Sequence, residues 1–221
     1  GSYTVSIVDV IAPTFCESPQ SAAVSVIFNP LPSAAPVVVP AATQVCSGGT
    51  ALITVNGTEA GINYQVFNGG VPVSGIVAGT GGSIGLSTSA LFANVTLTVK
   101  ATQPATGCNV SLAPTVAVTV NPLPTANAGG PVSVCQGSSA TLNGSGSGGT
   151  SPYSYSWSPV VGLSATNIAN PVFSGLTSTS FTLEVTDAKG CVSPGDNATV
   201  TVNPKPVANA GSDKNVCFGS S

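Results

Sequence analysis

The sequence predicts an all-β protein made of tandem β-sandwich domains arranged end to end. Its apolar residues are mostly Val, Ile, Leu and Ala that alternate with Ser, Thr and Asn, as in half-buried strands. The 18 Pro and 26 Gly residues divide the chain into many short strand candidates. A phrase also recurs, since "VNPLPTANAGGPVSVCQGSS" at 120–139 returns as "VNPKPVANAGSDKNVCFGSS" at 202–221. Together these observations indicate a repeated β-domain.

An Asn-Pro joint follows a strand candidate at three places, with its proline at Pro30, Pro122 and Pro204. The spacings of 92 and 82 residues are the size of a domain. We therefore expect two complete domains, preceded by the last two strands of one domain and followed by the first strand of another. The expected limits are 1–30, 31–122, 123–204 and 205–221.

The strand candidates "GSYTVSIVDV", "NVTLTVKA" and "SFTLEVTD" align with one another, and their apolar residues fall on one face of a two-residue repeat. Each complete domain offers about seven short strands with turn signals every 8 to 12 residues, which is typical of a sandwich of the immunoglobulin type. The predicted core positions, in matching groups, are Tyr3, Val95 and Phe181, then Val5, Leu97 and Leu183, then Ile7, Val99 and Val185.

The six cysteines recur in step with the Asn-Pro joints, one shortly before and one shortly after each joint. The joint-preceding cysteines are Cys16, Cys108 and Cys191, and the joint-following cysteines are Cys46, Cys135 and Cys217. A zinc site would need cysteines two to four residues apart, and no such pair occurs, so disulfides and an oxidising compartment outside the cytoplasm are favoured. We expect Cys46 to pair with Cys108 and Cys135 with Cys191, each pair closing one domain. The partners of Cys16 and Cys217 are expected outside this segment.

The residue types present exclude most enzyme chemistry. Histidine is absent, so a Ser-His-Asp or Cys-His arrangement is impossible, and the seven acidic residues are scattered. We expect no catalytic residue, no cofactor and no metal; among the acids only Asp213 lies close to a joint, where calcium would need several carboxylates. Four lysines and no arginine do not form a nucleic-acid surface, and no apolar run is long enough for membrane insertion.

Three aromatic residues, Tyr153, Tyr155 and Trp157, alternate with serines on one strand candidate. The first interpretation places their rings on the inner face of the sandwich. The alternative is an exposed platform on which sugar rings stack, which would require the three rings to face solvent.

The stretch "ANAGGPVSVCQGSSATLNGSGSGGTSPYSYSWSP", followed by "FTLEVTDAKGC" and "ATVTVNPKP", resembles the PKD and Ig-like repeats of very large secreted surface proteins of Bacteroidetes, including gliding-motility adhesins. The resemblance covers residues 123–221, whereas residues 33–122 share only the joints, the cysteines and the last two strands. The acidic turn and the Asp-Gly-rich motif usual in PKD repeats are replaced by "GSGSGGTSPY" and "SPVVGLS". The resemblance implies a secreted protein attached to the outer membrane at the cell surface.

These observations predict a structural or adhesive stalk segment of a long cell-surface adhesin or filament, used for gliding or surface attachment. Its partners would be neighbouring repeats of the chain, surface polysaccharide or other copies of the filament. One alternative is a carbohydrate-binding accessory module that uses the aromatic strand or the loops of residues 69–94. Another is a subunit of a self-assembling extracellular fibre that pairs through exposed sheet edges. For the stalk, strand lengths predict a slender rod of roughly 60 to 80 Å for two domains.

Overall fold

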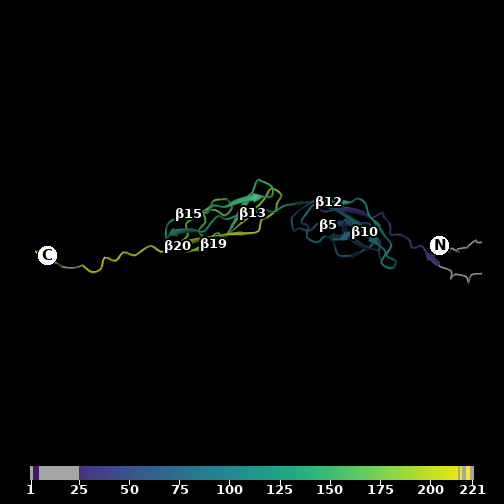
Figure 1. The fold of residues 1–221 in the computed structure, drawn as a ribbon, viewed down its shortest axis with the longest axis horizontal. Helices are drawn as coiled ribbons and strands as arrows, with labels where there is room; N and C mark the ends of the chain where they lie inside the picture. The colour runs from purple at the N-terminus through teal and green to yellow at the C-terminus, as the bar shows by residue number, and fades with distance from the viewer. Residues whose placement is uncertain (1, 5–24, 214, 216–217, 220–221) are drawn as a thin grey trace, which may run out of the picture. The chain divides into compact units, whose positions relative to one another are not determined.

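The computed structural model describes residues 2–4, 25–213, 215 and 218–219 (Figure 1). Every regular element in these ranges is a β-strand, which confirms the predicted all-β class. Among the same residues, none forms a helix with the length and apolar character needed to cross a membrane.

The chain divides into two compact units, Gly1–Val120 and Asn121–Ser221. This division falls at the second Asn-Pro joint, while the finer limits of the four expected segments stay predictions. The first unit starts with β1 (Ser2–Thr4) and β2 (Ser25–Ile27), which pair as antiparallel strands. Residues 37–121 then form the first sandwich.

One layer of the first sandwich is a three-stranded antiparallel sheet of β3 (Val37–Pro40), β5 (Leu52–Asn56) and β9 (Ile84–Ser87). Side chains on these strands alternate between core and solvent because successive residues of a strand point to opposite faces. On β5, for example, Ile53 is fully buried whereas its neighbour Leu52 is exposed.

The other layer has the strand order β4-β12-β10-β6-β7, with β11 paired to β10 and β8 paired to β6. Its strands are β4 (Gln44–Cys46), β6 (Asn63–Asn68), β7 (Val71–Pro72), β8 (Val77–Ala78), β10 (Val95–Thr102), β11 (Asn109–Ser111) and β12 (Val116–Asn121). Strand β10 lies at the centre, and Leu97 and Val99 on it are buried as predicted. The long strand of the repeat is therefore the core strand of this sheet.

Tyr64 on β6 anchors the first core and is fully buried. Its ring lies against Gly79, where any side chain would collide with the ring and with the Glu59 carbonyl oxygen. The Tyr64 hydroxyl accepts a hydrogen bond from the Glu59 N–H (2.9 Å), so the polar end of the ring is satisfied inside the sandwich. The Glu59 carboxylate in turn accepts the N–H of Ser33 (2.6 Å), which fixes the chain at the entrance to the sandwich.

The second sandwich, residues 124–203, has a four-stranded sheet in the order β14-β20-β19-β17 and two strand pairs, β13 with β16 and β15 with β18. Its strands are β13 (Pro124–Asn127), β14 (Val132–Cys135), β15 (Ala140–Thr141), β16 (Ser145–Gly148), β17 (Ser154–Ser158), β18 (Val172–Phe173), β19 (Thr179–Thr186) and β20 (Asp196–Asn203). Strand β14 runs parallel to β20, and the other pairs are antiparallel.

The core of the second sandwich is centred on β19. Phe181, Leu183 and Val185 are fully buried, which confirms the predicted inward face. Phe173 meets Phe181 edge to face, with ring centroids 5.6 Å apart. Val5 and Ile7, the residues predicted at the matching positions near the start of the chain, lie outside the described residues.

Strand β13 differs from the sequence expectation, which treated "NPLPTANAGG" as a joint. The strand begins at Pro124 and pairs with β16 alone, so it is a sheet edge where a residue without an N–H is tolerated. Its buried residues are Pro124 and Ala126, followed by the buried Ala128 just after the strand, and these residues give little hydrophobic alternation in the sequence.

Candidate functional site

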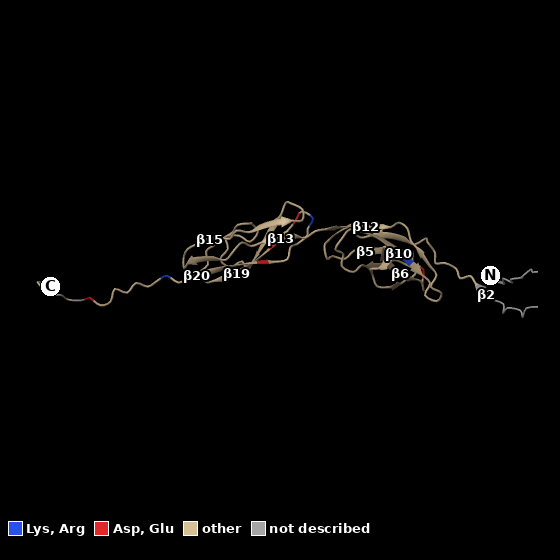
Figure 2. Cartoon of the chain, viewed as in Figure 1, with Lys and Arg blue, Asp and Glu red and all other residues tan. Residues whose placement is uncertain are grey.

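The chemically reactive side chains of this chain are few. Charged residues are sparse and scattered over both sandwiches (Figure 2). Within the described ranges, no three His, Cys, Asp or Glu side chains gather as a metal site, and every buried polar side-chain atom has a hydrogen-bond partner. An open groove beside β7 and β9 is lined by residues that include neither an aromatic nor a charged side chain: Pro72, Val73, Ser74, Gly75, Ser87, Thr88 and Ser89. The cysteines are therefore the side chains with the clearest chemistry.

Cys46 lies at the end of the first sandwich where β10 begins. It closes β4, and the following turn is fixed by a hydrogen bond from the Gly49 N–H to the Cys46 carbonyl (2.8 Å). That turn pairs with the chain just before β10, since the Gly48 N–H donates to Leu91 O (2.7 Å) and the Leu91 N–H donates to Gly49 O (2.8 Å). Phe92, next in the chain, is exposed at this end.

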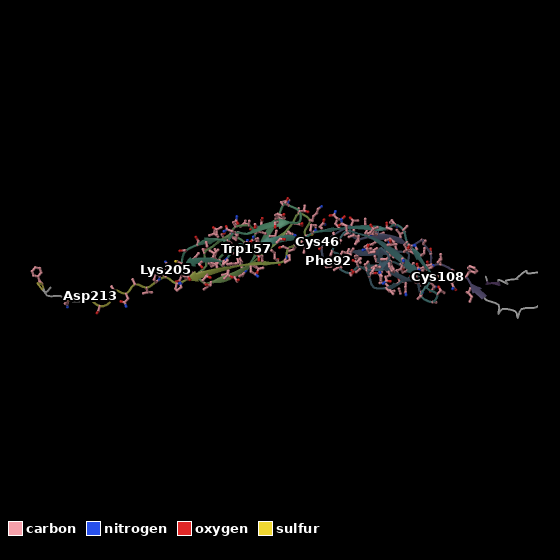
Figure 3. All side chains as sticks on the ribbon, viewed as in Figure 1. Cys46, Phe92, Cys108, Trp157, Lys205 and Asp213 are labelled. Atoms are coloured by element: carbon pink, nitrogen blue, oxygen red, sulfur yellow. The ribbon has the colours of Figure 1, made fainter. Side chains whose placement is uncertain are left out.

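Cys108 lies at the opposite end of the first sandwich, as Figure 3 shows. Its carbonyl accepts the Gln103 N–H (2.8 Å), which closes the hairpin after the last residue of β10, Thr102. Eight residues of β10 separate the two ends, a distance of about 23 Å at 3.3 Å per residue. A disulfide joins Cα atoms no more than about 7 Å apart. The predicted Cys46–Cys108 pair is therefore wrong.

The second sandwich repeats this arrangement along β19. Cys135, the last residue of β14, lies opposite Asn203 on β20. Thr179, the first residue of β19, lies opposite Val200, which is three residues before Asn203 on the same strand. Cys135 therefore lies at the end of the sandwich where β19 begins. Cys191 lies beyond the other end of β19, where its carbonyl accepts the Asp187 N–H (3.0 Å). The predicted Cys135–Cys191 pair is therefore wrong for the same reason.

The oxidation states agree with this geometry. Cys46 and Cys191 are each disulfide-bonded, whereas Cys108, which is half-buried, and Cys135, which is exposed, carry free thiols. Both predicted pairs would have needed one of the free thiols. The remaining cysteines of the sequence, Cys16 and Cys217, lie outside the described residues.

Asp187 organises the loop that holds Cys191, a role that the sequence reading missed. Its Oδ1 accepts the N–H groups of Lys189 and Cys191 (2.9 Å each), and its Oδ2 accepts the Thr150 N–H (2.9 Å). Burial opposes ionisation of this carboxyl, but the hydrogen bonds from Cys191, Thr150 and Lys189 and the nearby Lys189 charge outweigh burial and lower its pKa. The signal in the sequence is "DAKG", an Asp that caps a turn closed by Gly190 at φ 79°.

The three aromatic residues do not form an exposed platform. Trp157 on β17 is only 3% exposed, and its Nε1–H donates to the Ile168 carbonyl (3.0 Å). Tyr153 and Tyr155 are half-buried and pack against the core of the second sandwich. Their rings lie on the inner face because they share the parity of Trp157 along the strand. The structure thus supports the packing interpretation over a stacking surface for sugars.

Comparison with known proteins gives a family for the first sandwich. Residues 32–122 match the family described as "Ig-like domain CHU_C associated". The first sandwich is thus similar to an Ig-like domain in sequence as well as in fold. No curated protein matches the chain at a significant level.

Several solved structures of low sequence identity resemble the chain. The fibronectin(III)-like modules of Clostridium thermocellum CbhA are 12% identical, with 80% of this chain and 100% of that chain covered and a TM-score of 0.35. A C-terminal intimin fragment, solved with the intimin-binding domain of its translocated receptor, is 12% identical over 75% of this chain and 62% of that chain, with a TM-score of 0.44. An I-band fragment of titin is 13% identical over 77% and 66%, with a TM-score of 0.36.

Proposed function

We propose that this chain is a spacer segment of repeated Ig-like domains in a long cell-surface adhesin or filament, of the kind used for attachment or gliding. The observation that carries the proposal is the repetition of one plan. The same joint, the same buried central strand and the same two cysteine positions occur in both sandwiches. A domain that serves as a spacer can be repeated in this way, because each copy has its own hydrophobic core.

The surface chemistry supports a spacer. The chain carries a net charge of −3 from only four lysines and seven acidic residues, so it has no strong field to steer a ligand. Strand faces rich in Ser and Thr keep the sandwiches hydrated without attracting ions. Only two residues, 122 and 123, separate β12 from β13, which leaves little chain for a flexible linker.

An extracellular location is part of the proposal. Disulfide-bonded cysteines persist in oxidising compartments and are rare in the cytosol, and Cys46 and Cys191 are bonded in this way. The family match of residues 32–122 and the resemblance of residues 123–221 to surface repeats of Bacteroidetes favour the same location.

The two alternative functions have weaker support. A carbohydrate module usually offers exposed aromatic rings, whereas Trp157 is buried and the groove beside β7 and β9 lacks aromatic side chains. Lateral fibre assembly needs long exposed edges, but the edge strands β3, β4, β7, β9, β14 and β17 have only two to five residues each. Short edges of this kind limit pairing between chains.

Two experiments test the spacer function. In affinity electrophoresis through gels that contain cellulose, chitin or mannan, the purified chain should migrate as it does without polysaccharide. In the parent protein, replacement of this segment by two unrelated Ig-like domains should preserve attachment, whereas its deletion should reduce attachment. Retarded migration, or loss of attachment after the replacement, would show that the segment itself binds a ligand.

A further inference from the structure

Each described sandwich carries one cysteine at each of its two ends. Cys46 and Cys108 are separated by the length of β10, and Cys135 and Cys191 by the length of β19. Because eight residues of strand span about 23 Å, neither sandwich can form a disulfide across itself without unfolding.

The bonded cysteines therefore have partners outside their own sandwiches. Cys46 is disulfide-bonded, yet the other cysteine of its sandwich, Cys108, is a free thiol at the far end. Cys191 is also bonded, while Cys135 of the same sandwich is free. One of these bonded residues is a joint-following cysteine and the other is a joint-preceding cysteine.

The two free thiols occupy the equivalent positions in the repeat. Cys135 follows its joint as Cys46 does, and it ends a strand at the same place in the second sandwich. Cys108 precedes its joint as Cys191 does, and each of them follows the long central strand of its sandwich. Cys135 is exposed and Cys108 is half-buried, so neither residue is enclosed in a core.

We propose that Cys108 and Cys135 are covalent attachment sites for cysteines of other Ig-like units, so that disulfides form between units and not within one unit. Each such disulfide joins a joint-following cysteine to a joint-preceding cysteine. Its formation removes two protons and two electrons from the two thiols by thiol–disulfide exchange, and a disulfide oxidant such as oxidised glutathione accepts them and becomes two thiols. The proposal goes beyond the spacer function and does not depend on it, although a stapled array would suit a spacer.

The test uses the full chain with Cys16→Ser and Cys217→Ser, so that only the four described cysteines remain. Equal amounts of ¹⁴N- and ¹⁵N-labelled chain are concentrated, incubated with oxidised and reduced glutathione, and analysed by non-reducing gels and peptide mapping. We expect disulfide-linked multimers whose linking peptides join Cys108 of one isotope to Cys135 of the other.

Two matched variants make the test specific to complementary cysteines. In the same background, Cys135→Ser leaves Cys108 as the free thiol and Cys108→Ser leaves Cys135, and neither variant should form multimers. Efficient dimers in either variant would overturn the pairing rule. Monomers that carry only glutathione adducts, or Cys46–Cys108 or Cys135–Cys191 peptides, would overturn the proposal itself. Polysaccharide binding would overturn the spacer function and leave this inference unchanged.

Discussion

Gly144 lies directly against the indole ring of Trp157. A Cβ atom at position 144 would be 2.7 Å from Cζ2 of Trp157 and 2.5 Å from the Ala169 carbonyl oxygen. Gly146, two residues on, leaves room in the same way for the ring of Tyr153, which a Cβ would meet at 3.2 Å. The first two glycines of "LNGSGSGG", Gly144 and Gly146, are therefore sites where aromatic rings pack against bare backbone.

We expect Gly144→Ala to destabilise the second sandwich by about 1–3 kcal/mol, because the added methyl group overpacks a site bounded by backbone. Urea unfolding followed by circular dichroism measures the change. Gly130→Ala is the matched control, since a Cβ there meets nothing within 4 Å, and it should change stability by less than about 0.5 kcal/mol. Equal effects of the two substitutions would contradict the packing role of Gly144.

Trp157→Ala should destabilise the second sandwich by about 3–5 kcal/mol, because it removes a buried ring and leaves a cavity. The Ile168 carbonyl would also lose its hydrogen bond from the indole. Thermal and urea unfolding monitored by far-ultraviolet circular dichroism are suitable, since no tryptophan remains in the variant. Val160→Ala serves as the control because Val160 is exposed. A loss of less than about 1 kcal/mol for Trp157→Ala would indicate that the ring is not packed as described.

Asp187→Asn should lower the stability of the second sandwich at neutral pH, because the amide cannot accept three N–H groups as the carboxylate does. The folded-state pKa of Asp187 is below the ordinary value of 3.8, so its stabilising effect is fully present above that value. The effect is lost as the pH falls through the folded pKa.

Urea midpoints measured from pH 7 down to pH 2 provide the test. The native chain and Asp187→Asn should differ most at the upper end and converge at the lower end. Glu184→Gln, which changes an exposed carboxyl on the outer face of β19, should leave the midpoint unchanged at pH 7. A constant difference between the native chain and Asp187→Asn across the pH range would contradict the assigned role.

Calcium and chelators should leave the melting temperature of the chain unchanged. Among the described residues no acidic cluster gathers as a calcium site, although Asp213 follows the third joint. A site occupied at a hundred times its dissociation constant would add about 2.7 kcal/mol. For a domain of this size that corresponds to a shift of more than about 10 °C. Differential scanning calorimetry with calcium and with a chelator measures the shift, and an increase of several degrees with calcium would show that the chain binds this ion and contradict the prediction.

The central strands were predictable because burial on one face leaves a two-residue alternation in the sequence. Leu97 and Leu183 are fully buried at matching positions, as their patterns indicated. Strand β13 escaped prediction because it is an edge strand whose buried residues are a proline and an alanine, Pro124 and Ala126, which give a weak hydrophobic pattern.

The disulfide partners could not be predicted from the spacing of cysteines. The spacing distinguishes joint-preceding from joint-following cysteines, but it contains no information on which end of a sandwich each class occupies. That depends on the direction of the strands, and the long strand between the two positions places Cys46 and Cys108 at opposite ends. The prediction that each domain pairs its own two cysteines assumed that these two cysteines lie close together in space.

The buried indole of Trp157 also makes the chain convenient for optical work. It is the single tryptophan of the sequence, and it lies in the second sandwich, whereas the aromatic anchor of the first sandwich is Tyr64. Selective excitation of tryptophan therefore reports on the second sandwich alone, while circular dichroism reports on both. The two signals recorded in one titration would separate the unfolding of the two domains without labels or truncation.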